Sequence, residues 1–265
     1  MQSKADLHFH TWHSIDSLIS PKAAVDLAVE KGIRVLAITD HDSIDGAFAA
    51  RAYAEKHHLP VEIIIGEEIY SNAGHIIGLF LSERVESFLP VEDTLAELKR
   101  QNAIIIIPHL LFDEDVLGEY LYRYKVSYLD LIKNAEFLDA VHGVEVENFS
   151  TMEDDFSEKA NFMNGEFLKK ARISSSDSHI KLNFGYSYTL FEGSTAEDLR
   201  KAILEKTTVP VSTKRQQRLA YQLMGWGPIF KFPIHLSLQF SYRVLKSIYS
   251  TTKKLFKSNT KKHKG

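Results

Sequence analysis

Imidazole and carboxylate side chains recur in this chain at the points where short apolar runs end. The first group is His8 and His10, which follow the segment that begins at Ala5, and the second is Asp40 and His41. Residues two apart on a β-strand share a face, so His8 and His10 can approach one ion from the end of a strand. Imidazole and carboxylate groups are ligands for divalent metals. The spacing therefore predicts a metal centre.

The same pattern continues along the chain. The further candidates are Glu67 and Glu68, His75, His109, Glu145 and Glu147, and Asp177 and His179. Burying such groups without partners costs several kcal/mol each, so they must lie at an edge, pair with one another or hold a cation. Any one of these histidines is as often a packing residue as a ligand. Their recurrence at one strand end after another favours a single site, because parallel barrels carry functional residues there.

The composition narrows the chemistry of that site. The sequence has no cysteine, which excludes disulfides, thiolate zinc sites and cysteine nucleophiles. The remaining oxygen and imidazole ligands suit Zn²⁺, Mn²⁺ or Fe²⁺ and disfavour Mg²⁺ and Ca²⁺. The candidates outnumber one coordination sphere of about four to six ligands, so two or three ions are expected.

Strand-like and helical patterns alternate through the first 205 residues, as in an α/β protein with a parallel sheet or barrel. The expected strands are Ala5–His8, Arg34–Thr39, Val61–Glu68, His75–Leu81, Ile104–Pro108, Ala140–Val146, Arg172–Ser176 and Tyr186–Phe191. The expected helices include Pro21–Lys31, Val91–Arg100, Asp154–Lys170 and Ser194–Lys206, the last with a capping box formed by Ser194 and Glu197. Residues 110–138 are too long for a plain loop and predict a helical insertion over one end of the barrel.

The net charge of −3 conceals two oppositely charged parts. Residues 201–265 hold 14 Lys and Arg against the single acid Glu205, giving +13, and residues 1–200 hold 18 basic and 34 acidic residues, giving −16. We therefore expect a barrel over residues 1–210 and a basic, aromatic-rich tail over 211–265. An acidic body suits cations, whereas a basic tail suits an anionic membrane surface or RNA. A helix that packs on the barrel is the alternative for the tail.

No signal-peptide pattern and no apolar run of about 20 residues is visible in the sequence, so no transmembrane segment is expected. The expected location is cytoplasmic, or peripheral to the membrane if the tail binds lipid.

An ordered set of short motifs resembles the polymerase-and-histidinol-phosphatase (PHP) family of phosphoesterases over residues 5 to about 205. The set is His8-Phe9-His10, Thr39-Asp40-His41-Asp42, Gly66-Glu67-Glu68, Gly74-His75, His109 and Ser176-Asp177-Ser178-His179. The resemblance implies a distorted seven-stranded βα barrel, two or three metal ions and hydrolysis of a small phosphorylated substrate.

The resemblance also implies roles for individual residues. The first ion would be bound by His8, His10, the bridging carboxylate Glu68 and Asp177; the second and third would be served by His41, His75, His109 and His179. Glu68 is preferred to Glu67 because the family pattern is Gly-x-Glu. Asp16 matches an acidic position of nucleotide-directed members, and Asp16, His41 and His179 are the expected catalytic residues. Asp40 and Glu145 would orient imidazoles. Apart from the resemblance, the position of Lys181 two residues past His179 predicts contact with a substrate phosphate, and a solvated charge in a loop is the alternative.

One departure concerns the fifth strand, where Leu110 follows His109 although the family usually has Pro there. The sequence also lacks the paired aspartates of the tyrosine-phosphatase branch, so nucleotides or short oligonucleotides are favoured as substrates. A histidinol-phosphate or sugar-phosphate phosphatase is the nearest alternative. A non-catalytic metal-binding regulatory module and a metal-dependent amidohydrolase are less favoured, the first because the ligand set is intact.

Overall fold

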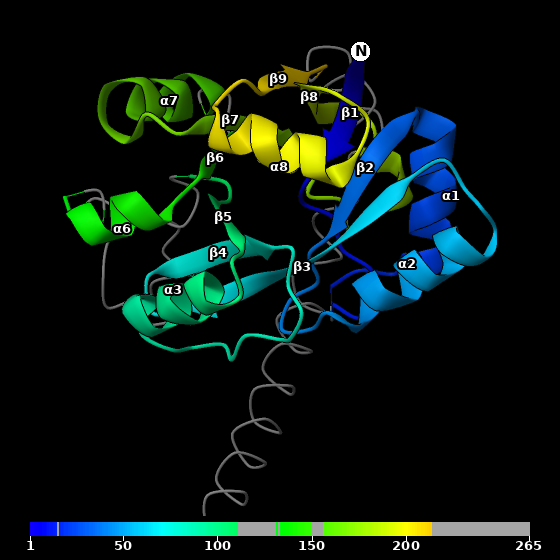
Figure 1. The fold of residues 1–265 in the computed structure, drawn as a ribbon, viewed down its shortest axis with the longest axis horizontal. Helices are drawn as coiled ribbons and strands as arrows, with labels where there is room; N and C mark the ends of the chain where they lie inside the picture. Colours follow the sequence, from blue (N-terminus) through cyan, green and yellow to red (C-terminus); the bar gives the residue numbers. More distant parts are fainter. Residues whose placement is uncertain (15, 111–130, 132, 150–155, 214–265) are drawn as a thin grey trace, which may run out of the picture. The chain divides into compact units, whose positions relative to one another are not determined.

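The computed structural model describes residues 1–14, 16–110, 131, 133–149 and 156–213. Its strands are β1 (Gln2–Asp6), β2 (Ile33–Ile38), β3 (Glu62–Ser71), β4 (Gly74–Leu79), β5 (Ile104–Ile107), β6 (Gly143–Asn148), β7 (Ala171–Ser175), β8 (Ser187–Glu192) and β9 (Val209–Ser212). Its α-helices are α1 (Pro21–Lys31), α2 (Asp45–Lys56), α3 (Val91–Arg100), α6 (Ala135–Ala140), α7 (Phe156–Met163) and α8 (Ala196–Leu204). Figure 1 shows the helices around the outside of the sheet.

Within the described residues, the strands form one sheet in the order β7-β6-β5-β4-β3-β2-β1-β8-β9. The pairs β1–β2, β2–β3, β5–β6 and β6–β7 are parallel, whereas β4 and β8 run antiparallel to both of their neighbours. Side chains join the two ends of the sheet: Thr189 donates to the carbonyl of Ser174 at 2.9 Å, and Ser174 Oγ donates to the carbonyl of Val211 at 2.8 Å. The expectation of a distorted α/β barrel is confirmed, and the antiparallel strands are the distortion.

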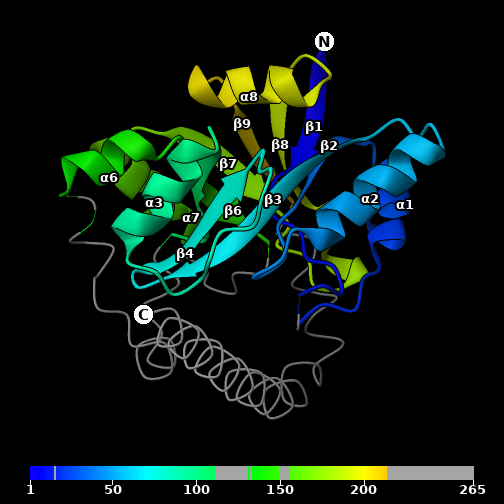
Figure 2. The same ribbon diagram turned by 60° about the horizontal axis from the view of Figure 1, so that its bottom comes forward.

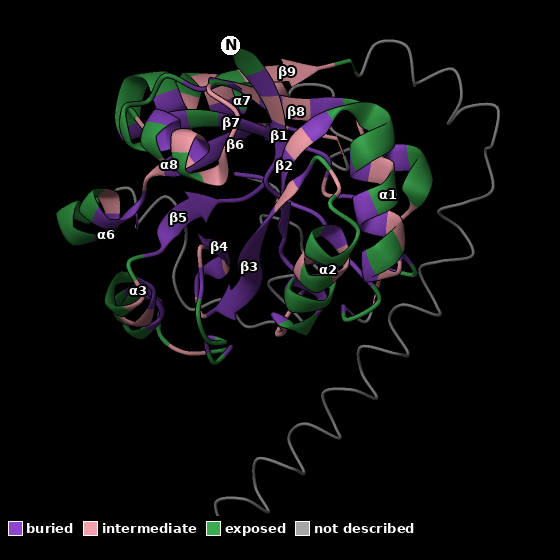
Figure 3. Ribbon diagram, turned by 45° about the vertical axis from the view of Figure 1, so that its right-hand side comes forward, coloured by how far each residue is buried: buried purple, intermediate pink, exposed green. Residues whose placement is uncertain are grey.

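The four isoleucines of β5 explain how the barrel is filled. Ile104 and Ile106 belong to a cluster inside the barrel, and Ile105 and Ile107 belong to the cluster beneath the outer helices. A strand buried on both faces requires such an unbroken apolar run. Figure 3 shows β3, β4 and β5 largely buried, β9 of intermediate burial, and the helices exposed on their outer faces.

Helix α8 covers the end of the barrel where the parallel strands begin (Figure 2). The main-chain N–H of Ala196 donates to Glu62 at the start of β3 at 2.7 Å, and Arg200 donates to the carbonyl of Asn102 just before β5 at 2.5 Å. The buried side chains of α8, including Leu199 and Ile203, join the interior cluster. The opposite end, where the parallel strands finish, is left for the ionisable residues.

The hairpin between β3 and β4 brings His75 to that same end. The register pairs Tyr70 with His75 and Ser71 with Gly74, so only Asn72 and Ala73 lie between the two strands. Because β4 is antiparallel to β3, its first residues lie beside the last residues of β3. A histidine at the beginning of β4 therefore reaches the same edge as carboxylates at the end of β3.

Several expected boundaries are wrong. Ala140 is the last residue of α6, and β6 begins only at Gly143. The box that caps α8 is formed by Thr195 and Asp198, one residue later than expected. The long helix expected over Asp154–Lys170 is divided in the described residues: α7 ends at Met163, and a π-helix, Asn164–Leu168, follows it.

The edges of the expected domains lie partly outside the described residues. Strand β9 pairs with β8 as far as Ser212, two residues beyond the expected end of the barrel. The tail lies outside the described residues, as does most of the expected insertion over 110–138. None of the described helices is long and apolar enough to cross a membrane.

Candidate metal centre

The alternation of β3 decides which of its two adjacent glutamates faces the ionisable cluster. Glu68 lies among imidazoles, with Oε2 3.0 Å from His8 Nε2 and Oε1 2.9 Å from His75 Nδ1. Glu67 lies on the opposite face, where Oε2 accepts a 2.8 Å hydrogen bond from the main-chain N–H of Val85. Successive residues of a strand point to opposite faces, so only one of two buried neighbours can join the cluster.

A first group of ligand atoms surrounds Oε2 of Glu68. The Nε2 atoms of His8 and His10 lie 3.0 Å apart, and Glu68 Oε2 is 3.0 Å from one and 3.2 Å from the other. Oδ1 of Asp177 is 3.4 Å from His8 Nε2 and 3.3 Å from His10 Nε2. Both imidazoles are fully buried. Four ligand atoms from four different side chains therefore converge on one point.

The Nδ1 contacts of the two imidazoles show what that point requires. His8 Nδ1 is 3.1 Å from Glu145 Oε1, and His10 Nδ1 is 3.0 Å from Ser14 Oγ. An ionised Glu145 can only accept, so Nδ1 of His8 must carry a proton, and Ser14 can accept a proton from Nδ1 of His10 in the same way. Each neutral ring then presents the lone pair of Nε2 to two carboxylates. Acceptor atoms that converge in this way repel one another unless a cation lies between them. The donor set therefore fits a divalent ion.

A second group forms on the other oxygen of Glu68. Oε1 is 2.9 Å from His75 Nδ1 and 3.0 Å from His109 Nε2, and these two nitrogens are 3.3 Å apart. The main-chain N–H of His109 donates to Glu145 Oε2 at 2.8 Å. One glutamate, Glu145, thus contacts the ring of His8 and anchors the backbone of His109. Glu68 in turn joins two groups of imidazoles through its two oxygens.

A third group lies around Asp16. Its Oδ2 is 3.4 Å from His41 Nε2 and 3.3 Å from His179 Nε2, and the ring of His179 stacks on that of His10 at 4.1 Å. His41 Nε2 is also 3.5 Å from Glu68 Oε2, so this group adjoins the first. Oδ1 of Asp16 and Nδ1 of His41 are buried with no hydrogen-bond partner among the described residues. Buried polar atoms without partners indicate a place for an ion or water.

The electrostatics of the cluster favour positive charge. Burial disfavours the charged form of Glu68, but the imidazoles around it, His8 foremost, hold its pKa well below the usual range. Burial also opposes positive charge on His41 and His179. The carboxylates of Glu68 and Asp16 outweigh this effect at His41 and raise its pKa to about 10. Asp16 likewise raises the pKa of His179 to about 9. Protons or metal ions must supply this positive charge. Metal binding at such a site therefore releases protons.

The backbone at the ends of the strands is held in unusual conformations. Asp42, His109 and Asp177 have positive φ angles of 56°, 26° and 48°. Residues with side chains adopt this region rarely, and such strain is concentrated at functional sites.

Known proteins share both the sequence and the fold of residues that form this cluster. The PHP domain family matches residues 6–207, about three quarters of the chain. The chain belongs to the PHP domain family. As a member, it is a metal-dependent phosphoesterase.

Two relatives of this PHP domain differ in how much of their sequence the chain covers. It is 32% identical to the uncharacterized protein MJ0417 of Methanocaldococcus jannaschii over 192 residues, 71% of this chain and 70% of the relative. It is 41% identical to the 5′-3′ exoribonuclease Rnm of Salmonella typhimurium over 78 residues, 28% of this chain and 26% of the relative. The chain thus matches about a quarter of the exoribonuclease.

Solved structures share the fold of the PHP domain at lower identity. A two-domain protein from Bacteroides vulgatus that contains a predicted PHP-like metal-dependent phosphoesterase has a TM-score of 0.61 at 21% identity, over 80% of this chain and 65% of that one. Endonuclease Q, in complex with a 27-mer duplex that has an abasic lesion at the active site, has a TM-score of 0.53 at 17% identity, over 77% of this chain and 56% of that one. Less than two thirds of each of these longer chains is covered.

The PHP domain brings together every ligand expected from the sequence. These residues are His8, His10, Asp16, His41, Glu68, His75, His109, Asp177 and His179. Lys181 lies in an exposed 3₁₀ turn, Lys181–Asn183, and no described hydrogen bond or ion pair joins it to the cluster. His142 contacts the main chain of Ile105 instead of the cluster.

Sequence reasoning missed two polar residues that contact the ligands. Ser14 Oγ contacts His10, and Asn148 Nδ2 donates to Glu145 at 2.9 Å and to Asp177 at 3.3 Å. The position of Asn148 at the end of β6, three residues after Glu145, was the available signal. Ser14 had none, because serine is common in loops.

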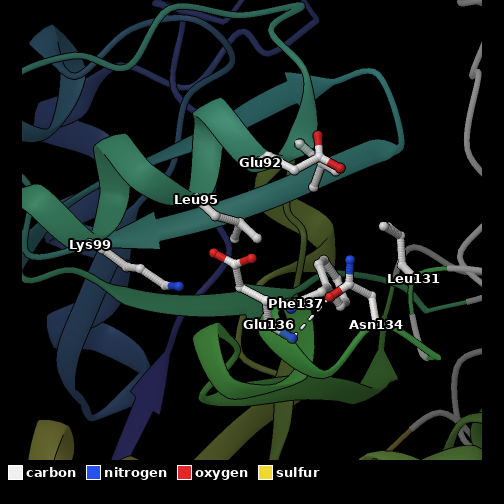
Figure 4. Close-up of a pocket in the computed structure, with 8 residues that line it drawn as sticks. Glu92, Leu95, Lys99, Leu131, Asn134, Glu136 and Phe137 are labelled. Atoms are coloured by element: carbon white, nitrogen blue, oxygen red, sulfur yellow. Dashed lines mark hydrogen bonds between the residues drawn. The ribbon is translucent and has the colours of Figure 1, made fainter.

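A small surface pocket between α3 and α6 is separate from the ligands of the PHP domain (Figure 4). Its lining consists of Val91, Glu92, Leu95, Lys99, Leu131, Asn134, Glu136 and Phe137. Asn134 caps α6 by accepting hydrogen bonds from the main-chain N–H groups of Glu136 and Phe137. Asn134 thus serves the start of a helix, and no lining residue of the pocket belongs to the cluster around Glu68.

Proposed function

We propose that this PHP domain hydrolyses phosphate esters of nucleotides or short oligonucleotides at a centre of two or three divalent ions. The observation that carries the proposal is the position of Glu68, whose two oxygens lie within 3.0 Å of imidazole nitrogens from different strands, Oε2 facing His8 and Oε1 facing His75 and His109. A carboxylate placed in this way would help to hold two ions, one with each group of imidazoles.

The ligands divide among three ions as follows. His8, His10, Glu68 and Asp177 would hold the first ion, and Glu68, His75 and His109 the second. Asp16, His41 and His179 would hold the third, and His41 also lies close enough to Glu68 and His75 to be shared with the second. This set of imidazoles and carboxylates suits Mn²⁺, Zn²⁺ or Fe²⁺.

The chain's own residues would position the ester and handle protons. Ions at such a site supply an activated water and neutralise charge on the phosphoryl oxygens. Asp16 and His179 lie at the outer side of the cluster, where their side chains retain 10% and 26% of their exposure. They can therefore reach a bound ester, and we assign the catalytic roles to Asp16, His41 and His179. Lys181, two residues beyond His179, would pair with a second phosphate.

The preference for nucleotides rests on similarity and on the sequence. The relatives of named activity are 5′-3′ exoribonucleases, each matched over less than half of this chain. The spacing of His10 and Asp16 adds the acidic position of nucleotide-directed members. A histidinol-phosphate or sugar-phosphate phosphatase would use the same ions, so substrates must be compared directly.

The test is hydrolysis by the full-length protein with Mn²⁺, Zn²⁺ or Fe²⁺. The panel contains nucleoside monophosphates, a 5′-phosphorylated pentaribonucleotide, histidinol phosphate and ribose 5-phosphate. We expect the highest kcat/KM for the nucleotide or the oligonucleotide. The highest value for histidinol phosphate or ribose 5-phosphate would reassign the substrate, and no turnover of any ester would contradict an enzymatic role.

Two adjacent glutamates provide a matched pair of variants. Glu68→Gln should lower turnover by at least about 100-fold and reduce the number of bound ions, because the amide cannot bridge two cations. Glu67→Gln, equally buried but facing Val85 and Arg84, should keep turnover within about tenfold, a barrier change below about 1.4 kcal/mol. Equal losses in both variants would show that the glutamates act through folding alone.

A further inference from the structure

The hydroxyl of Ser14 lies at a junction between two of the ligand groups. Its Oγ is 3.0 Å from His10 Nδ1, 2.8 Å from the main-chain nitrogen of His41 and 3.1 Å from Asp40 Oδ1. Ser14 is only 1% exposed, and Asp40 and His10 are fully buried. Water therefore cannot replace these contacts easily.

The donor count at this junction allows one arrangement. The main-chain N–H of His41 can only donate, and an ionised Asp40 can only accept. A serine hydroxyl has one proton to give and two lone pairs to receive. The proton therefore points to Asp40, one lone pair receives the N–H of His41, and the other receives a proton from Nδ1 of His10. His10 must then carry its proton on Nδ1 and direct the lone pair of Nε2 at Glu68 and Asp177.

Asp40 is itself held firmly in the accepting role. The main-chain N–H of Thr11 donates to Oδ1 at 2.5 Å, and the hydroxyl of Thr11 donates to Oδ2 at 2.7 Å. Gly46 packs so closely that a Cβ atom there would lie 2.0 Å from Asp40 Oδ2. The carboxylate of Asp40 thus has no room to turn, and it stays in place to accept the proton of the Ser14 hydroxyl.

We propose that Ser14 is a positioning residue that fixes the tautomer of His10 and the backbone of His41 together, with Asp40 setting the direction of its hydroxyl. The inference rests on the proposed function, because it assigns His10 and His41 to metal ions. His8 is oriented by a direct contact with Glu145, at 3.1 Å. His10 is oriented through a hydroxyl that also holds a residue of the third group. Ser14 therefore couples two ion sites, through a ring nitrogen of His10 and the main chain of His41.

The first test reads the tautomer in metal-free protein, so it does not depend on activity. In ¹⁵N-histidine-labelled protein at alkaline pH, we expect Nδ1 of His10 to carry a proton, whether or not Nε2 carries one as well. Ser14→Ala removes the acceptor of the Nδ1 proton, so in that variant we expect the proton of His10 on Nε2, which faces Glu68 and Asp177. A proton that stays on Nδ1 in Ser14→Ala would overturn the proposal, whether or not the protein hydrolyses phosphate esters.

The second test measures Mn²⁺ and Zn²⁺ affinity by calorimetry. Ser14→Ala should weaken binding about 10- to 100-fold, the usual effect of losing a group that orients a metal-binding histidine, and Ser14→Thr should recover most of it. The control is Ser174→Ala, because Ser174 is equally buried but its hydroxyl bonds the carbonyl of Val211. Equal losses in Ser14→Ala and Ser174→Ala, or none in either, would overturn the proposal. If the wild type binds neither ion, the proposed function fails and the tautomer test still decides the role of Ser14.

Discussion

The Nδ1 atom of His142 accepts a hydrogen bond from the main-chain N–H of Ile105 at 3.0 Å. His8 uses the same atom to donate to Glu145. The direction of this one hydrogen bond distinguishes His142 from His8. A ring that donates from Nδ1 presents a lone pair at Nε2 and can bind an ion, whereas His142 must remain neutral to serve as an acceptor.

His142 gives the unfolding free energy a specific pH dependence. Burial, reinforced by Lys170 and Arg200, lowers the pKa of His142 below its usual value. The stabilisation is therefore complete above about pH 6.5, the value in the unfolded chain, and is lost as the pH falls through the lower folded value. We expect the loss to be less than about 1 kcal/mol, because solvent screens a half-buried group.

Urea denaturation from pH 8 to pH 5 measures this effect. His142→Gln keeps an acceptor for Ile105 but cannot take up a proton, so its stability relative to the wild type should rise as the pH falls. Since the ligand histidines titrate in both proteins, the difference between the two curves isolates His142. A difference that does not change with pH would show that His142 makes no such contribution.

Most residues of the cluster could be predicted from sequence because they stand at the ends of apolar runs, whereas Asp16 was expected only from the resemblance to the PHP family. The choice of Glu68 over Glu67 also agrees with the alternation of a strand. The contacts of Ser14 could not be predicted, because they join it to Asp40 and His41, which are 26 and 27 positions away. Only the packing of β1 against β2 brings such residues together.

At the level of elements, helices and strands were predicted best where one pattern dominates. Pro21 and Gly32 define α1 closely, since Ser20 caps its beginning and Gly32 ends it with a φ of 67°. Ala140 was wrongly assigned to a strand because the apolar residues before Gly143 suit a helix as well as a strand. Strand β9 was missed because it is short and contains Pro210, a residue that strands tolerate at edges.

The π-helix that follows α7 is capped by Lys169, whose backbone conformation suits glycine better than lysine. Lys169 is exposed, has a φ of 55° and donates its main-chain N–H to the carbonyl of Asn164 at 2.7 Å. A left-handed conformation costs a residue with a side chain about 1 kcal/mol. Lys169→Gly should therefore stabilise the folded protein by roughly 0.5–1 kcal/mol.

The matched control is the same substitution within a helix. Lys201 is exposed in α8, so Lys201→Gly should destabilise the protein by about 1 kcal/mol. Thermal and urea denaturation of the three proteins measure both changes. Effects of the same sign in the two variants would contradict the explanation based on backbone conformation.

For the whole molecule, the separation of charge along the sequence leads to a prediction about the tail. All proposed ligands lie between His8 and His179, and the last strand of the sheet ends at Ser212. Deleting residues 214–265 should therefore preserve ion binding and the hydrolysis of a small ester. The same deletion should weaken binding to single-stranded RNA, and the difference should shrink as salt is raised, because it depends on screened charges.

Fluorescence titration with a labelled oligoribonucleotide at low and high salt measures this binding, and sedimentation with anionic vesicles compares a lipid surface. Loss of vesicle binding alone would assign the tail to membranes. Equal binding by full-length and truncated protein would give the tail no anionic partner. An unfolded truncated protein would show that the barrel needs residues beyond Thr213.

The contacts between the end of β1 and the segment that follows β7 have a consequence for how the protein is made. Asp6 accepts a hydrogen bond from the main-chain N–H of Ser176, 170 positions later, and the main-chain N–H of Asp177 donates to the carbonyl of His8. A ribosome adds about 5–20 residues per second, so roughly ten to thirty seconds pass between the synthesis of the two partners. During that interval the nascent chain has His8 and His10 but no Asp177. The ions can therefore enter a complete site only after nearly the whole barrel has left the ribosome.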